Sequence, residues 1–393
     1  MIKSIQLKNF LSFRDQTIDF QTGTNVLIGI NGSGKSNLFK ALRLFREGVF
    51  GMGIERYILE VLGGMDQAVF MGKNVNAFSL LLTLDGPKVT DLASGFRFTD
   101  DVVIKISCSK VPGSDGFYIE EEVSTSKGFI YLQFRNGRGH MKRKKELVKY
   151  EGWNAREFAL REIRDSDSDL SIELVTVKRA LESFLVYPNF DTTSNSPTRK
   201  AVPPSLDKRL SFDGSNLTQV LFHLKHNYKS AFHKLIHNLQ EVNPNFSDID
   251  FKPIGTSLEL VLEEKGLERS IHASQISDGT IRFLCLLSII YNPNRGNLIC
   301  IDEPEGGLHP DMIGGLAEAF SEIEDGSTLI LSTHSESFLD HFPVLAIRVF
   351  EKDEENATVV KSLSEEELDH WVSDYAAGQL WSKGALGAVR YGR

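Results

Sequence analysis

Residues 29–36 read Gly-Ile-Asn-Gly-Ser-Gly-Lys-Ser, and this pattern constrains the fold more than any other stretch of the chain. Residues 24–28 before it are typical of a buried strand, and residues 37–45 after it carry apolar side chains at helical spacing. Glycines allow the tight wrap that presents many backbone N–H groups to one phosphate chain, and the following helix adds its positive N-terminus. The three parts in this order predict a phosphate-binding loop, with a turn that binds nothing as the alternative.

Two side chains of the predicted loop have specific roles. We expect Lys35 to reach the β- and γ-phosphates of a nucleoside triphosphate and the Ser36 hydroxyl to ligate Mg²⁺. The predicted cofactors are therefore ATP and Mg²⁺. The predicted nucleotide-binding residues of this region are Gly29, Asn31, Gly32, Ser33, Gly34, Lys35, Ser36 and Asn37.

A pair of carboxylates follows a second apolar stretch, residues 296–301. Asp302 is placed to hold Mg²⁺ through water, and Glu303 is placed to orient and deprotonate the water that attacks the γ-phosphate. The alternative is a chance Asp-Glu turn, which the glycine loop in the same chain disfavours. The predicted metal-holding residue is thus Asp302, and the predicted general base is Glu303.

A histidine stands at the end of a third apolar strand. Residues 328–332 are followed by Thr-His-Ser, which places His334 at the C-terminal end of that strand. In an open α/β sheet this is the edge where ligands bind, so we expect His334 to hydrogen-bond the γ-phosphate. The alternative is a histidine that only caps the following turn.

A second anion-binding helix start is predicted at residues 274–280, directly before the apolar helix 281–290. Ser277, Gly279 and the first helical N–H groups make up this nest. A chain that already holds one phosphate loop rarely needs a second nest in the same site. We therefore expect Ser277 and Gly279 to complete the site of a second subunit, with an ordinary capped helix start as the alternative.

These four elements, in this order, resemble the ABC-type ATPase heads of the SMC and RecF class. Residues 276–280 stand where that class has its signature motif, His334 matches its switch histidine, and residues 7–13 look like its N-terminal strand. Residues 302–310, Asp-Glu-Pro-Glu-Gly-Gly-Leu-His-Pro, resemble more closely the OLD-like and RecF-like stand-alone bacterial ATPases, many of them found in antiphage defence operons. Residues 214–217 resemble the G-x-N-L that precedes their signature.

The resemblance implies an α/β P-loop NTPase of the ABC/SMC-head type with two lobes and no long coiled coil. Residues 1–187 would form an N-terminal lobe with the P-loop and an antiparallel, β-rich insertion. Residues 188–345 would form a helical and parallel-sheet lobe with the signature, Asp302, Glu303 and His334, and residues 346–393 a tail. The resemblance further implies a head-to-head dimer that binds two ATP molecules and hydrolyses them slowly.

The sequence departs from the pattern in places. The signature reads Ser-Asp-Gly-Thr and not the Ser-Gly-Gly-Gln of transporters, and the D-loop aspartate is replaced around His309. The residues after His334 leave no room for the TOPRIM domain of OLD nucleases. ABC-type ATPases often carry a glutamine that touches Mg²⁺ and the attacking water, and Gln67 is the candidate here, with a plain surface glutamine as the alternative.

The composition is that of a soluble globular protein, with 41% hydrophobic and 25% charged residues in 393. No run approaches the ~18 apolar residues of a membrane span. The three cysteines, Cys108, Cys285 and Cys300, lie far apart in the sequence and are expected to be core thiols in a reducing cytoplasm. We therefore expect a cytoplasmic protein without a membrane contact.

A basic run interrupts a chain whose net charge is −9. The bland interpretation is a solvated hairpin and helix start, and the sharper one is contact with the phosphate backbone of DNA or RNA. No aromatic residue is interleaved, so base stacking is not indicated. The run comprises Arg135, Arg138, Lys142, Arg143, Lys144, Lys145 and Lys149, with only Glu146 against them.

Three functions compete. The first is an ATPase that regulates or scaffolds a separate effector, a nuclease or toxin, in antiphage defence. The second is a RecF-like ATPase that acts on DNA directly, and the third is a self-contained nuclease, which the missing TOPRIM room disfavours. For the tail, packing on the chain's own sheet competes with partner docking, and docking is the hypothesis carried forward. The tail residues concerned are Trp371, Tyr375, Leu380, Trp381, Leu386 and Tyr391.

Overall fold

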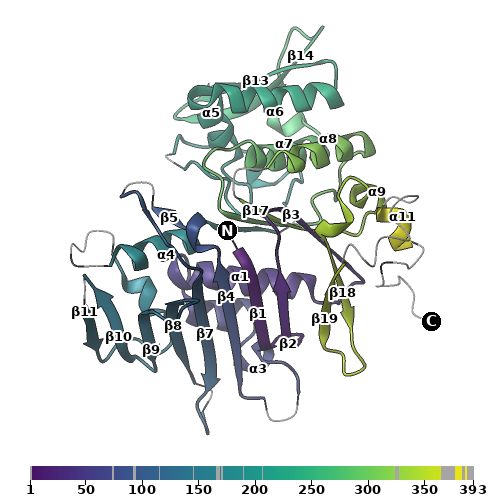
Figure 1. The fold of residues 1–393 in the computed structure, drawn as a ribbon. Helices are drawn as coiled ribbons and strands as arrows, with labels where there is room; N and C mark the ends of the chain where they lie inside the picture. The colour runs from purple at the N-terminus through teal and green to yellow at the C-terminus, as the bar shows by residue number, and fades with distance from the viewer. Residues whose placement is uncertain are drawn as a thin grey trace.

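Two large sheets with one long helix between them organise the molecule (Figure 1). The structure, a computed structural model, describes residues 2–72, 75–91, 94–114, 116–144, 146–164, 169, 171–188, 190–205, 207–323, 327–363, 377–382 and 386.

The larger sheet has eight strands in the order β11-β10-β9-β8-β7-β4-β1-β2, and every neighbouring pair is antiparallel. In β4, Phe78, Leu80, Leu82 and Leu84 are buried while the residues between them are half-exposed. This period of two is typical of an antiparallel sheet with one face on a core. The strands are β1 Ile2–Phe10, β2 Phe13–Asp19, β4 Ala77–Leu84, β7 Val102–Lys110, β8 Phe117–Thr125, β9 Ile130–Arg135, β10 Arg138–Arg143 and β11 Glu146–Tyr150.

The second sheet has six strands in the order β12-β16-β17-β3-β18-β19, and only the β18–β19 pair is antiparallel. Both faces are covered: Leu298 and Cys300 belong to one apolar core, and Ile299 and Ile301 to the other. That double burial explains why these strands read as continuous apolar runs. The strands are β3 Gly23–Gly29, β12 Phe184–Tyr187, β16 Leu298–Asp302, β17 Thr328–Ser332, β18 Ile347–Lys352 and β19 Thr358–Ser362.

The chain order does not separate the two sheets. The P-loop strand β3 and the edge strand β12 come from the first 187 residues, yet both lie in the six-stranded sheet. Residues 346–393 were assigned to a tail, but β18 pairs with β3, so the first part of that stretch belongs to the central sheet. Pairing with the P-loop strand decided this placement, and the sequence pattern carried no sign of it.

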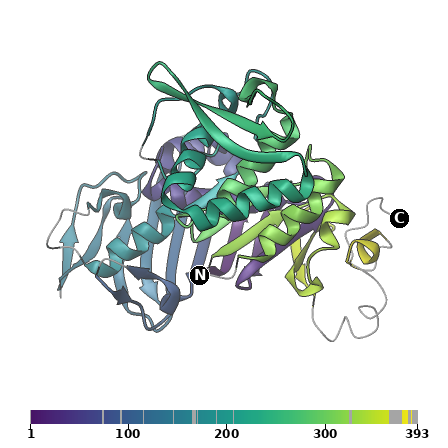
Figure 2. The ribbon, with the colours of Figure 1, turned by 90° about the horizontal axis from the view of Figure 1, so that it is seen from above.

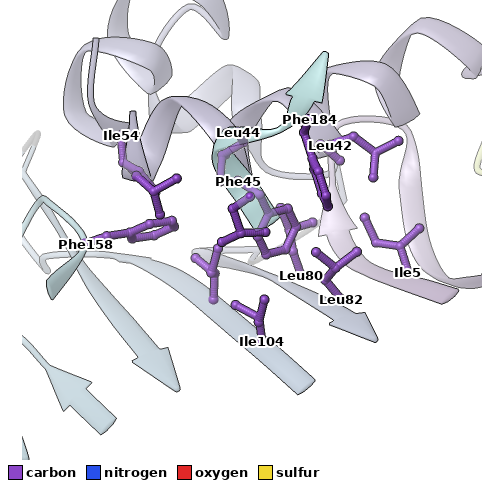
Figure 3. Close-up of a cluster of buried hydrophobic side chains, with 14 of the residues drawn as sticks. Ile5, Leu42, Leu44, Phe45, Ile54, Leu80, Leu82, Ile104, Phe158 and Phe184 are labelled. Atoms are coloured by element: carbon purple, nitrogen blue, oxygen red, sulfur yellow. The ribbon is translucent and has the colours of Figure 1, made fainter. Parts of the chain in front are cut away.

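Helix α1, Lys35–Val49, lies between the sheets. Figure 3 shows its Leu42, Leu44 and Phe45 packed over the large sheet, with Phe184 of β12 in the same cluster. Nearly every apolar residue of α1 is buried, because a sheet covers each side of the helix. The helix that follows the P-loop is thereby held in a fixed position.

A helical layer covers the outer face of the six-stranded sheet, with a β-hairpin beyond it (Figure 2). Helix α7 is buried along almost its whole length, because α5 and α8 pack on it. The elements are α5 Leu217–Asn227, α6 Lys229–Val242, α7 Asp278–Ile290, α8 Pro310–Ser321, α9 Glu336–Leu339, β13 Phe246–Ile254, β14 Ser257–Glu264 and β15 Ile271–His272.

The connecting segments form short elements. Between the basic run and β12 the chain forms a 3₁₀ turn, Ala159–Glu162, and α4, Ile172–Glu182. The basic run forms the β10–β11 hairpin without a helix start. Other short elements are α2 Ile54–Arg56, a π-helical turn Tyr57–Val61, α3 Met65–Ala68, the strand pair β5 Thr90–Asp91 and β6 Phe96–Arg97, and the 3₁₀ turns Gly86–Lys88, Pro197–Arg199, Ala273–Gln275 and Val344–Ala346.

The described tail residues pack on the chain itself. Helix α11, Ala377–Ser382, lies against α9, with Leu380, Trp381 and Leu386 buried in the core that also holds Phe338. For these side chains the packing interpretation replaces partner docking, because α9 supplies an apolar surface that the sequence did not reveal. Trp371, Tyr375 and Tyr391 lie outside the described residues.

In the described part of the chain, no helix is both long and apolar enough to cross a membrane. Cys108, Cys285 and Cys300 are buried and free of disulfide bonds.

Candidate nucleotide-binding site

The P-loop has the backbone that its glycines allow. Gly29, Gly32 and Gly34 have positive φ angles of 151°, 80° and 112°. A Cβ at Gly29 would collide with the carbonyl oxygen of Phe350, and one at Gly34 would collide with the Thr358 hydroxyl. The loop therefore needs glycine at both positions for conformation and for space.

The Lys35 side chain folds back along the loop. Its Nζ donates to the carbonyl oxygens of Gly29 at 2.7 Å and Ile30 at 3.3 Å. Burial lowers the pKa of Lys35 to about 8, although the nearby Asp302 and Glu303 carboxylates raise it. A polyphosphate in the loop adds negative charge and would raise the pKa of this ammonium again.

A magnesium-type oxygen pair lies beside the loop. Ser36 Oγ donates to Asp302 Oδ2 at 3.4 Å, and Ser332 Oγ donates to Asp302 Oδ1. Ser36 lies in the first turn of α1 and Asp302 ends β16, so the pair forms where helix and sheet meet. A hydroxyl and a carboxylate fit Mg²⁺, which prefers oxygen ligands.

Glu303 is held in an unusual backbone conformation. Its φ is +46°, and its N–H donates to the Ser332 carbonyl at 3.1 Å. Left-handed non-glycine residues cost about 1–3 kcal/mol and cluster at functional sites. Its carboxylate is half-exposed, with Oε1 3.7 Å from Nε2 of His334. The predicted base and the predicted γ-phosphate contact are therefore neighbours.

The turn after β16 is fixed from two sides. The buried Arg282 of α7 donates from Nη2 to the Glu303 carbonyl at 2.6 Å and from Nε to the Pro304 carbonyl at 3.4 Å. Glu305 accepts from the Thr333 hydroxyl and from the His334 N–H at 3.3 Å, and burial raises the pKa of Glu305. The turn after β16 is therefore bonded both to α7, which carries the signature, and to the residues around His334 after β17.

The signature lies at the N-terminus of α7. Ser277 caps the helix, with Oγ accepting from the Thr280 N–H at 3.1 Å. The buried Arg199 holds the preceding loop through the carbonyls of Ala273 and Ile276, at 2.7 and 2.6 Å. Among the hydrogen bonds and ion pairs of the described residues, none joins Ser277 or Gly279 to residues 29–37.

Comparison with family models decides the family. The model described as "AAA domain, putative AbiEii toxin, Type IV TA system" matches residues 142–340, just over half of the chain. A second AAA domain model matches residues 4–50, which run from β1 into α1. The chain belongs to the AbiEii-type AAA domain family.

Relatives agree with this assignment. A Helicobacter pylori (strain ATCC 700392 / 26695) protein named "ATP/GTP phosphatase" is 22% identical over 393 residues, which cover 93% of either chain. A Thermoplasma volcanium Rad50 ATPase is 51% identical over 43 residues, 11% of this chain and 5% of that one. An Smc head bound to the C-winged helix domain of ScpA superposes with a TM-score of 0.57 at 16% identity, covering 93% of this chain and 99% of that chain. The predicted SMC/RecF-type ATPase head is thereby confirmed, and the AAA domain is an ATPase of that type.

Two predicted site residues of this AAA domain, Asn37 and Gln67, make no described contact with the Ser36–Asp302 pair. Asn37 Nδ2 donates to Ser12 Oγ at 2.8 Å, so this side chain anchors the loop to the β1–β2 turn. Gln67 is exposed on α3, and none of the described contacts connects its side chain to Ser36 or Asp302. Its assignment to the metal stays a prediction, and the geometry favours the surface alternative.

Sequence reasoning missed the residues that support the P-loop of the AAA domain but come from distant parts of the sequence. The Thr358 hydroxyl of β19 lies 2.7 Å from both Ser12 Oγ and the Ser33 carbonyl. The Thr358 N–H also donates to the Ser12 carbonyl at 2.7 Å. No local pattern marks Ser12, Thr358, Arg199 or Arg282, because each acts through a contact with a remote segment.

The basic run is largely neutralised within the chain. Lys142 pairs with Glu173 at 2.5 Å, and both side chains are mostly buried. Arg135 pairs with Glu120, Lys144 with Asp169 and Lys149 with Glu151. Lys145 lies outside the described residues.

Neighbouring strands also bring aromatic rings to this run, which the linear sequence hid. Lys142 Nζ lies 5.3 and 5.1 Å from the ring centroids of Phe129 and Tyr131, and Arg143 contacts Tyr150.

Proposed function

We propose that this ATPase dimerises head to head on ATP and thereby regulates a separate effector, a nuclease or toxin of an antiphage system. One observation carries the dimer: Ser277 and Gly279 head α7 without a described contact to their own P-loop. The family description names a putative toxin of a type IV TA system. The Smc head described as bound to a ScpA domain supports a head of this fold working with a separate protein.

In this proposal the chain's own residues divide the work of hydrolysis. Lys35 binds the β- and γ-phosphates, and Ser36 and Asp302 hold Mg²⁺, which offsets the charge that develops on the phosphate oxygens. Glu303 orients the attacking water and takes its proton, while His334 hydrogen-bonds the γ-phosphate. Ser277 and Gly279 of the second subunit complete the site at the γ-phosphate.

The Glu303→Gln variant tests the ATP-dependent dimer. The change removes the base and keeps the size and phosphate contacts, so ATP should stay bound and the dimer should persist. Sedimentation with MgATP should give a stable dimer for Glu303→Gln, a transient one for the parent and monomer for Lys35→Ala. Glu322→Gln, at a surface ion pair with Lys234, is the matched control. Hydrolysis by Glu303→Gln at the parent rate would remove Glu303 from the role of base.

The effector part has its own test. The product of the neighbouring gene is co-expressed with tagged parent, Glu303→Gln and Lys35→Ala proteins. Recovery of that product should be highest with Glu303→Gln, because its dimer is trapped, and lowest with Lys35→Ala. Equal recovery with all three proteins would mean that binding of the partner does not depend on the ATPase cycle.

A RecF-like ATPase that acts on DNA is the second candidate. Local similarity to proteins named Rad50 ATPase and RecF favours it. Arg138→Glu and Lys149→Glu reverse charge on the exposed hairpin while sparing the buried Lys142–Glu173 pair. Under this candidate, duplex DNA binding in low salt should be lost in the double variant. Unchanged binding would remove the hairpin from this role.

A further inference from the structure

A cavity of about 560 Å³ opens away from the nucleotide site, between α1, β12 and residues 207–212. Arg43 and Arg46 of α1 line it. Arg46 lies eleven residues after Lys35, roughly 16 Å further along the helix at about 1.5 Å per residue. The cavity and the P-loop therefore occupy different parts of the same helix.

The lining carries more positive than negative charge. Its cations are Arg43, Arg46, Lys208 and Arg209, and its carboxylates are Glu47, Glu182 and Asp207.

The Glu47 carboxylate is shared by the two arginines of α1. Arg43 Nε and Arg46 Nη1 both donate to Glu47 Oε1 at 3.3 Å, and Glu47 Oε2 accepts from the Met52 N–H at 3.1 Å. Arg46 Nε is buried without a hydrogen-bond partner. A buried donor with no acceptor is costly, so this wall has unmet capacity for an anion.

The opposite wall adds to that capacity. Arg209 lines the cavity there, and its Nε donates to the Asn294 carbonyl at 2.6 Å. Although part of its side chain is exposed, burial of the guanidinium and the positive charge of Arg46 lower the pKa of Arg209. Two guanidiniums close enough to repel each other are stabilised when an anion binds between them.

Two exposed aromatic rings line the same cavity. Phe50 and Phe212 are 54% and 57% exposed, whereas most phenylalanines of the described residues are buried. The guanidinium carbons of Arg46 and Arg43 lie 5.3 and 5.6 Å from these two rings, respectively. Exposed rings beside arginines are the combination that holds a base by stacking and its phosphate by charge.

We propose that this cavity binds a base-bearing phosphate, from a free nucleotide or from a single-stranded nucleic acid, at a site separate from the P-loop. Phe50 and Phe212 would stack on the base, and Arg46 and Arg209 would bind the phosphate. The volume lies within the roughly 300–1,000 Å³ of small-ligand sites. Because α1 carries both this wall and Lys35, such a ligand is placed to act as an input to the ATPase, whatever effector it controls.

Fluorescence anisotropy with two probes tests the site. The probes are a labelled oligodeoxythymidylate about 15 nucleotides long and a mant-labelled AMP, both measured on full-length protein carrying Lys35→Ala so that the P-loop does not contribute. In this background, Arg46→Ala with Arg209→Ala and, separately, Phe212→Ala should each weaken binding about tenfold or more. Arg269→Ala, in the exposed turn between β14 and β15, is the control and should change nothing.

The two probes distinguish the sources of the ligand. Loss of oligonucleotide binding alone, with a steep salt dependence in the parent, identifies a nucleic acid strand. Loss of mant-AMP binding identifies a free nucleotide. Arg209→Ala and Phe212→Ala alter exposed side chains, so melting temperature and, with Lys35 restored, basal ATPase rate should stay at the parent values. Binding of neither probe by the parent, or equal binding by the cavity variants, overturns the proposal.

Discussion

The nucleotide site and the β10–β11 hairpin both gather charged side chains, but they balance these charges in different ways. In the nucleotide site, Lys35 hydrogen-bonds to backbone carbonyl oxygens. The Asp302 and Glu303 carboxylates raise its pKa, but none of the ion pairs of the described residues includes Lys35. In the hairpin, Lys142 and Lys144 each reach a carboxylate of the same chain. Lys35 of the candidate site therefore keeps its charge available for a ligand, whereas Lys142 and Lys144 of the hairpin are paired within the chain.

The largest expected difference between the two regions is in ATP binding. Lys35→Ala should weaken MgATP binding by about a hundredfold or more, because it removes the ammonium that the phosphates need. Lys144→Ala, the matched lysine of the hairpin, should bind MgATP like the parent. Isothermal titration calorimetry measures MgATP binding by both variants. A similar loss of affinity in both would show that the two regions do not differ in this way.

A second effect of similar origin is expected at Arg282. Arg282→Ala removes the contacts to the Glu303 and Pro304 carbonyls, so the base should lose its position while the phosphate contacts remain. We expect kcat to fall about tenfold or more with little change in KM. Arg282→Lys should recover part of kcat. A parallel change of both constants, or no recovery by lysine at matched melting temperature, would reduce Arg282 to a general stabilising role.

Substitutions in the hairpin should change the stability of the protein and not its ATP binding. Lys142→Met leaves the mostly buried Glu173 carboxylate without its lysine partner, so the free energy of unfolding should fall by about 1–3 kcal/mol. Lys144→Met, at an exposed pair, should be indistinguishable from the parent. Urea unfolding of both variants measures the difference. Loss of stability in Lys144→Met instead would mean that the exposed pair, and not the buried one, holds the hairpin.

A pH dependence of stability is expected from Lys35. Its pKa is about 8 in the folded protein and 10.5 for an ordinary lysine, so the unfolded chain binds more protons between these values. The free energy of unfolding of the nucleotide-free parent should therefore rise relative to Lys35→Met as pH increases from about 8 to 10.5. Below about pH 8 the difference should be constant. Urea unfolding at neutral pH and near pH 10 checks the sign.

The predictable part of the site is the part whose chemistry is local. Gly29 and Gly34 are required by the positive φ angles of one short loop, and Asp302 and Glu303 follow directly from the end of one strand. Such requirements leave a pattern in consecutive residues. The SMC/RecF-type fold followed from the order of these patterns and is confirmed.

The remaining parts depend on contacts between distant segments. Thr358 supports a loop more than three hundred residues away, and β18 completes the central sheet beside β3. Arg282 acquires its role only because α7 packs against the turn after β16. The ion-pair partners of the basic run could not be predicted for the same reason, because Glu173 and Asp169 come from outside it. Single residues carry no sign of such partners.

A mixing experiment tests the composite site most directly. Lys35→Ala has an intact signature, and Ser277→Arg has an intact P-loop with a blocked signature, so neither variant should hydrolyse ATP by itself. An equal mixture forms heterodimers with one complete site, because the P-loop of the Ser277→Arg subunit meets the signature of the Lys35→Ala subunit. We predict recovery of about a quarter of the parent ATPase rate on mixing. A mixture as inactive as its components would contradict a site shared between two subunits.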